Sequence, residues 1–74
     1  VVSESTRGIA SALAAAQRAG LVDATLDPEL AARAYLSMEA GMLLWWLEDP
    51  RRAARDRLVG TLVRAHPAEA SRIA

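Results

Sequence analysis

Two Asp-Pro pairs, which begin at Asp27 and Asp49, constrain the fold more than any other feature of this sequence. An aspartate before proline favours the start of a helix. The carboxylate accepts hydrogen bonds from free N–H groups of the first turn, and proline has no N–H that needs a partner. The negative charge also suits the positive end of the helix dipole. The two pairs therefore predict one helix over 28–48 and another over 50–65.

The predicted helix over 28–48 is apolar around most of its circumference. One helical stripe consists of Ala31, Ala34, Tyr35, Met38, Met42 and Trp45, and a second consists of Ala32, Leu36, Leu43 and Leu47. No charged residue occurs from Ala40 to Leu47. A helix with so little polar surface must be buried on two sides. Other helices of the same chain are expected to cover one side, and a second copy of the chain is the simplest cover for the other.

The rest of the chain predicts two further helical segments and a short loop. A helix over 3–19 is expected to end at Gly20, which favours the left-handed conformation of a helix terminus. Residues 21–26 are expected to form a loop. The helix over 50–65 carries an expected Arg52–Asp56 pair and stops before Pro67, and 68–74 are expected to add one turn. The sequence thus predicts an all-α fold with three main helices.

The length and composition limit the kinds of site that the chain can hold. Seventy-four residues give a small core that rarely stabilises a chain alone. The sequence has no cysteine and one histidine, so no disulfide, metal site or cofactor is expected. Nine acidic and nine basic residues balance, which favours no global attraction to nucleic acid. The longest uncharged run is far shorter than the ~20 residues of a membrane span, so a soluble, cytoplasmic protein is expected.

Residues for catalysis or nucleic-acid binding are few. His66 precedes a proline at a helix end and is expected to be solvated, and Asp49 is explained by helix capping, so no catalytic residue is assigned. Four arginines within 51–57 favour, as an alternative, a small helical module that binds nucleic acid through its phosphates. Acidic residues among them favour a solvated surface instead. A helical piece of an enzyme whose site lies elsewhere is a further alternative, although no residue here points to it.

The stripe of Tyr35, Met38, Met42 and Trp45 allows two interpretations. Flexible methionine side chains and aromatic rings suit the wall of a pocket for a flat, small, apolar ligand. More often such a stripe is part of the hydrophobic core.

The order of the segments carries a family resemblance. The stretch AQRAGLVDATLDPELAARAYLSMEAGMLLWWLEDP, followed by LVGTLVRA, resembles the C-terminal region of the TetR family of bacterial transcriptional regulators. The matching features are Gly20, Asp27-Pro28-Glu29, Ala31-Ala32, Gly41 and the Trp-Leu-x-Asp-Pro that ends at Pro50. They extend over about Ala15 to Ala65, most of the chain.

The resemblance implies a homodimer that senses a small apolar effector. In that family the last two long helices of each subunit form a four-helix bundle across a two-fold axis, and an N-terminal helix-turn-helix domain binds the operator. That DNA-binding domain is absent from this chain, so DNA is an expected partner of the intact protein only.

Two residue sets follow from this expectation. The predicted dimer interface consists of Leu36, Gly41, Leu43, Leu47, Leu58, Gly60 and Leu62. The predicted ligand-binding or core side consists of Tyr35, Met38, Met42 and Trp45. The sequence leaves open whether the two sides are exchanged.

Overall fold

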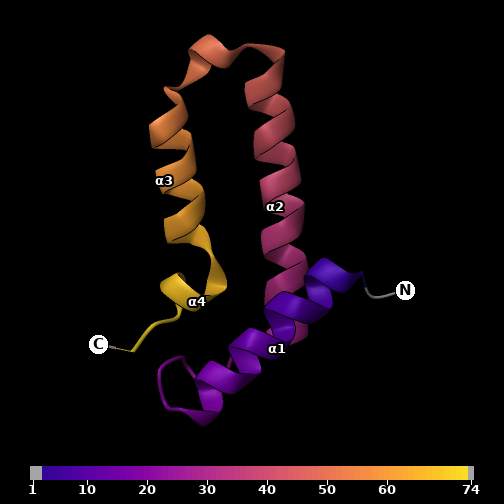
Figure 1. The fold of residues 1–74 in the computed structure, drawn as a ribbon, viewed down its shortest axis with the longest axis vertical. Helices are drawn as coiled ribbons and strands as arrows, with labels where there is room; N and C mark the ends of the chain where they lie inside the picture. The colour runs from indigo at the N-terminus through magenta and orange to yellow at the C-terminus, as the bar shows by residue number, and fades with distance from the viewer. Residues whose placement is uncertain (1–2, 74) are drawn as a thin grey trace.

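Four α-helices and one short 3-10 helix form the fold within residues 3–73, the part of the chain that this computed structural model describes. In chain order they are α1 (Glu4–Arg18), α2 (Pro28–Glu48), η1 (Pro50–Arg52), α3 (Arg55–Ala65) and α4 (Pro67–Ala70). Figure 1 shows α2 and α3 running antiparallel, with α1 crossing the first turns of α2 and α4 at the lower end of α3. The predicted all-α class is confirmed.

Local hydrogen bonds explain where α1 begins and ends. The Ser3 hydroxyl oxygen accepts from the backbone N–H of Thr6 at 3.1 Å. At the other end, the N–H of Leu21 donates to the carbonyl of Ala16 at 2.9 Å. This bond closes a Schellman motif, which needs a left-handed residue just before Leu21, and Gly20 supplies it with a φ of 76°. The predicted end of the first helix at Gly20 is confirmed.

Gly20 and Gly8 give a matched pair of substitutions with opposite expected signs. Gly20→Ala should lower the free energy of unfolding by about 1 kcal/mol, because an L-residue is strained at this positive φ. Gly8 lies inside α1, where an added methyl group would meet no atom within 4 Å. Gly8→Ala should raise the free energy of unfolding by about 0.5–1 kcal/mol, because it lowers the entropy of the unfolded chain. Urea unfolding at one fixed protein concentration measures both values, and a stabilising Gly20→Ala would contradict this account of the α1 terminus.

The first Asp-Pro pair starts α2 as predicted. Asp27 Oδ1 accepts from the N–H groups of Glu29 at 3.0 Å and Leu30 at 3.3 Å. The side chain of Arg33 pairs with Glu29 one turn along at 3.2 Å. No helix within residues 3–73 is both long enough and apolar enough to cross a membrane.

The second Asp-Pro pair starts only η1, so the predicted continuous helix over 50–65 is wrong in its first part. Asp49 caps η1, after which Ala53 and Ala54 are extended, with ψ values of 146° and 142°. The reason is a tertiary hydrogen bond. The indole N–H of Trp46 donates to the carbonyl of Ala53 at 2.8 Å and holds this residue outside a helix. The last long helix therefore begins at Arg55.

Because the helix is broken after η1, the partner of Arg52 differs from the predicted Asp56. Its guanidinium donates to the carbonyl of Trp45 at 2.7 Å and to the carboxylate of Glu48 at 3.3 Å. Asp56 instead accepts from the backbone N–H of Arg57 at 2.9 Å. The predicted Arg52–Asp56 pair is wrong, because the break after η1 removes the helical spacing that the pair requires.

The chain end returns to the loop between α1 and α2. Val22 and Arg72 form an isolated antiparallel bridge, and the N–H of Ile73 donates to the carbonyl of Leu21 at 2.9 Å. Gln17 supports the loop from α1, donating to the carbonyl of Leu26 at 2.7 Å. The loop predicted over 21–26 is present, with this single bridge inside it.

The turn predicted over 68–74 is observed as α4. It starts one residue earlier than predicted, at the buried Pro67, and ends at Ala70. Ala74 lies outside the described residues, as do Val1 and Val2.

The buried apolar side chains are few and lie mostly at the lower end of the fold. Among residues 3–73 they are Leu13, Val22, Ala32 and Leu58, with the ring of Pro67. The Cα atoms extend over 41, 33 and 15 Å, and the radius of gyration is 13.5 Å, against about 11 Å for a compact chain of this length. The thickness of 15 Å accommodates one helix crossing, that of α1 over α2. Above that crossing, α2 and α3 form a single layer, called here the α2–α3 hairpin (Figure 1).

Candidate functional site

Two hydrogen bonds fix which side of α2 faces α3. Tyr35 Oη donates to the carbonyl of Leu62 at 3.3 Å. The indole N–H of Trp46 donates to the carbonyl of Ala53, in the segment before α3, at 2.8 Å. Met42 lies between these two residues on the same side of α2 and lines a cleft together with Leu58 of α3. We call these five residues, Tyr35, Met42 and Trp46 of α2 with Leu58 and Leu62 of α3, the contact line of the hairpin.

Helical geometry places the neighbouring side chains on two opposite faces of the hairpin. Consecutive residues of a helix are rotated by about 100°, so each residue that directly follows a contact-line residue points towards one face. Because α2 and α3 run antiparallel, this one-residue step leads to the same face on both helices. We call this surface the leucine–valine face. It consists of Leu36, Leu43, Leu47, Val59 and Val63.

The leucine–valine face is largely uncovered in the single chain. Leu36, near the crossing with α1, is half-buried. Leu47 is 63% exposed, and Val59 and Val63 are 50% and 56% exposed. One exposed leucine is ordinary for a protein surface, but a contiguous apolar face made by two helices is typical of an interaction surface.

The opposite face carries a small groove between the same two helices, called here the arginine–tryptophan groove. It has a volume of about 210 Å³, and its lining includes Met42, Trp45, Arg52, Arg57, Leu58 and Thr61. The Trp45 side chain is 43% exposed. Thr61 donates its hydroxyl hydrogen to the Arg57 carbonyl at 2.8 Å, which fixes one wall of the groove.

The two arginines of the groove differ in their partners. The guanidinium carbon of Arg52 lies 5.3 Å from the ring centroid of Trp45. The Arg52 guanidinium donates hydrogen bonds to the Trp45 carbonyl and to the Glu48 carboxylate. The Arg57 guanidinium forms no hydrogen bond or ion pair with any other group in residues 3–73. No carboxylate lines the groove within that same stretch, so its local charge is positive.

Two arginines of the 51–57 cluster pair with carboxylates. Arg51 lies 2.9 Å from Asp49, and Arg52 lies 3.3 Å from Glu48. Hydrogen bonds from Arg51 hold the pKa of Asp49 below its ordinary value. Such surface pairs add little stability. They do reduce the positive charge that the cluster presents, and so they weaken the phosphate-binding alternative.

Tyr35 and His66 connect the lower ends of α2 and α3. Their ring centroids are 4.8 Å apart at an interplanar angle of 59°. Burial, and after it the neighbouring Glu39 carboxylate, raise the pKa of Tyr35, so its phenol keeps the proton that it donates to Leu62. His66 Nδ1 accepts from the N–H of Ala68 at 3.2 Å. The expected solvated His66 is wrong, because the ring is half-buried in this contact.

The structure divides the predicted dimer residues into three groups. Leu36, Leu43 and Leu47 belong to the leucine–valine face. Leu58 and Leu62 lie on the contact line, where Leu58 is 5% exposed. Of the remaining residues, Gly41 directly precedes Met42 and lies on the groove side of α2, whereas Gly60 is on the side of α3 that points away from α2. No atom of the described residues lies near the Cβ position of Gly41, whereas the Arg64 guanidinium covers Gly60 at 3.6 Å.

The predicted ligand-binding residues lie along the contact line and on the groove side of it. Tyr35 and Met42 are on the contact line, Trp45 lines the groove, and Met38 is exposed on the same face as Trp45. Sequence reasoning did not select Val59, Val63, Arg57 or Thr61 for either face. The signal that identifies them is that each lies directly before or after Leu58 or Leu62. That signal is informative only once these two leucines are known to face α2.

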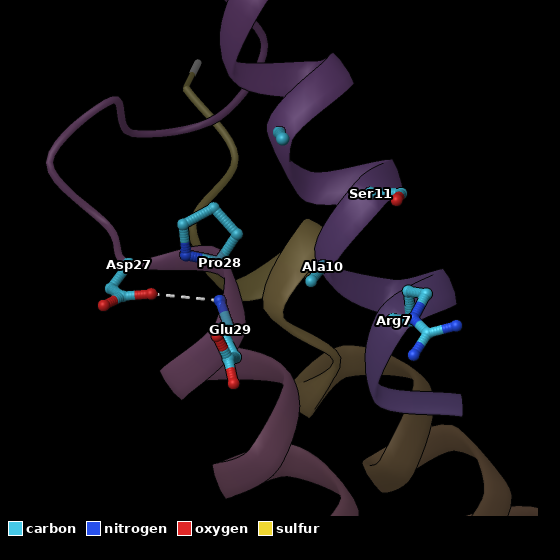
Figure 2. A pocket seen from close by; sticks show the side chains of 7 residues that line it. Arg7, Ala10, Ser11, Asp27, Pro28 and Glu29 are labelled. Carbon is cyan, nitrogen blue, oxygen red and sulfur yellow. Dashed lines mark hydrogen bonds between the residues drawn. The ribbon is translucent and has the colours of Figure 1, made fainter. Parts of the chain in front are cut away.

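Two further hollows lie outside the hairpin interior. Figure 2 shows the one at the crossing of α1 and α2, with a volume of about 370 Å³, whose lining includes Arg7 and Ser11 of α1 and Pro28 of α2. Both of its acidic residues have partners: Asp27 accepts the hydrogen bond that caps α2 (Figure 2), and Glu29 pairs with Arg33. The other, of about 610 Å³, is open surface along α3 around Val59 and adjoins the leucine–valine face. Neither brings together groups that point to a reaction.

Comparisons of the chain with protein-family models, with curated proteins and with solved structures return no match.

Proposed function

We propose that this chain is the dimerisation and effector-sensing region of a TetR-like bacterial transcriptional regulator that acts in the cytoplasm. The order of its elements supports the proposal. A helix ended by Gly20, a long helix after Asp27 and a helical hairpin turned at Asp49 correspond to what the resemblance implies. Operator binding belongs, in this proposal, to a helix-turn-helix domain outside these 74 residues.

The observation that carries the dimer proposal is the uncovered leucine–valine face. Soluble domains bury the apolar side of each helical layer against a second layer. Within residues 3–73 the upper part of the α2–α3 hairpin has no second layer, and its exposed side chains come from both helices. A two-fold axis through this face would place each hairpin on its twin and form a four-helix bundle, since an isologous interface uses the same patch twice.

The arginine–tryptophan groove supports the sensing part of the proposal. It lies on the face of the hairpin opposite to the leucine–valine face, so a ligand and a second chain would occupy different surfaces. A ligand that packs between α2 and α3 would bind best at one separation of these helices. Because the proposed bundle contains the same two helices, ligand binding would bias the relative orientation of the subunits and of their DNA-binding domains.

Sedimentation equilibrium of the purified chain tests the dimer proposal. The expected result is a molecular mass twice that of the chain at micromolar concentration, with helical circular dichroism. A well-folded species of single-chain mass over the same concentration range would contradict it.

A further inference from the structure

We propose that the arginine–tryptophan groove binds a small planar aromatic carboxylate, with the ring packed on Trp45 and the carboxylate bound to Arg57. This inference deepens the proposed function, because it gives the chemical class of the effector.

The size and the lining residues of the groove favour a small aromatic ligand. Pockets for drug-sized ligands have volumes of about 300–1,000 Å³, so the volume of about 210 Å³ suits a molecule of one or two rings. The Arg52 guanidinium lies over one face of the Trp45 indole, and the exposed remainder of this ring offers a flat surface for stacking. Met42 and Leu58 supply apolar contacts. A planar aromatic ring matches these walls better than a sugar or a polar peptide.

The charges of the groove favour a carboxylate as the polar group of this ligand. Arg52 is held by Glu48 and by the Trp45 carbonyl, so its position is fixed and part of its charge is balanced. Arg57 lines the same groove without a carboxylate partner among residues 3–73. A guanidinium binds a carboxylate through two parallel N–H···O bonds, a geometry that a neutral amide does not reproduce.

The same charges argue against a second copy of this chain as the occupant. A two-fold axis that passes through the groove would bring Arg57 towards the Arg57 of its twin, and like charges opposed across an interface are unfavourable. The leucine–valine face is uncharged at Leu43, Leu47, Val59 and Val63, and the arginine at its border, Arg55, lines the adjoining hollow together with the carboxylate-bearing Asp56. The groove therefore remains accessible to a small anion in the proposed dimer.

Titration of the full chain with 2-naphthoate, followed by NMR, tests this inference. The indole N–H signal of Trp45 should shift in a saturable way, while that of Trp46, which is bonded to Ala53, should shift less. The uncharged isostere 2-naphthamide should bind about tenfold or more weakly, because it lacks the charge-assisted bond. Assignment of the two indole signals comes from Trp45→Phe and Trp46→Phe.

Two arginine substitutions on α3 provide the matched comparison. Arg57→Gln should weaken 2-naphthoate binding about tenfold and abolish its advantage over the amide. Arg55→Gln removes the same charge from the same helix, but Arg55 lines the separate hollow around Val59 and not the arginine–tryptophan groove. It should leave the affinity within about twofold.

Three outcomes would overturn the inference: no saturable shift at millimolar 2-naphthoate, equal affinity for the amide, or equal effects of the two arginine substitutions. Each is distinguishable from failure of the proposed function, because the mass of the ligand-free chain is measured independently. A dimer that does not bind 2-naphthoate would contradict only the proposed ligand class. A monomer that binds 2-naphthoate would contradict only the proposed dimer.

Discussion

Replacing Leu47 by glutamate is expected to convert the dimer into a monomer that keeps its helices. Leu47 is 63% exposed in the single chain, so the change should cost the isolated fold little. In the proposed bundle, however, a two-fold axis buries two uncompensated carboxylates, which costs several kcal/mol. The dissociation constant should therefore rise by at least about 100-fold, since each 1.4 kcal/mol is a factor of ten.

Leu30→Glu is the control for this effect. Leu30 is on the same helix and is 64% exposed, almost the same as Leu47, but it lies about 100° or more around α2 from the leucine–valine face. Sedimentation equilibrium should show Leu30→Glu as a dimer and Leu47→Glu as a monomer. If both variants, or neither, dissociate, the leucine–valine face is not the interface.

Replacing Leu13 by alanine is expected to give the largest loss of fold stability. Leu13 is the large side chain that is completely buried among the described residues, at the crossing of α1 and α2. Truncation of a buried leucine to alanine costs about 2–5 kcal/mol. A chain of this length has a total stability of roughly 4–11 kcal/mol, so a large part of it should be lost.

Leu44→Ala is the matched substitution for Leu13→Ala. Leu44 is also helical, but it is 67% exposed and points away from both faces of the hairpin. Its replacement should change the free energy of unfolding by no more than about 0.5 kcal/mol. Urea unfolding at one fixed protein concentration compares the two, because dimerisation makes stability depend on concentration. Equal losses would show that the α1–α2 crossing is not the centre of the core.

The helix boundaries set by local chemistry were predictable from the sequence. Ser3, Gly20 and Asp27 each act on backbone groups within a few residues, so their effects depend little on the rest of the fold. The Asp49 cap was predictable for the same reason.

The break at Ala53 and Ala54 was not predictable in the same way. Both residues favour helix by propensity, and the hydrogen bond from Trp46 that holds Ala53 extended joins residues seven positions apart. It forms only when the indole turns towards α3. A tertiary contact thus overrides the local preference, and with it the expected partner of Arg52.

The candidate site was predictable in outline and not in detail. The apolar composition of the segment around Leu43 indicated two buried sides for α2. Which residues of α3 join each face depends on the rotation of α3 about its own axis, and the contacts of Leu58 and Leu62 fix that rotation. Val59 and Arg57 flank Leu58 in sequence, yet they belong to opposite faces.

The central claim is that a second copy of the chain covers the leucine–valine face, and isotope-filtered NOE spectroscopy tests it most directly. In a one-to-one mixture of labelled and unlabelled chains, only contacts between two copies give filtered signals. Intermolecular NOEs should link the methyl groups of Leu43 and Leu47 to those of Val59 and Val63. Their absence in a sample of dimer mass, or intermolecular NOEs from the Leu30 and Met38 methyl groups in their place, would contradict it.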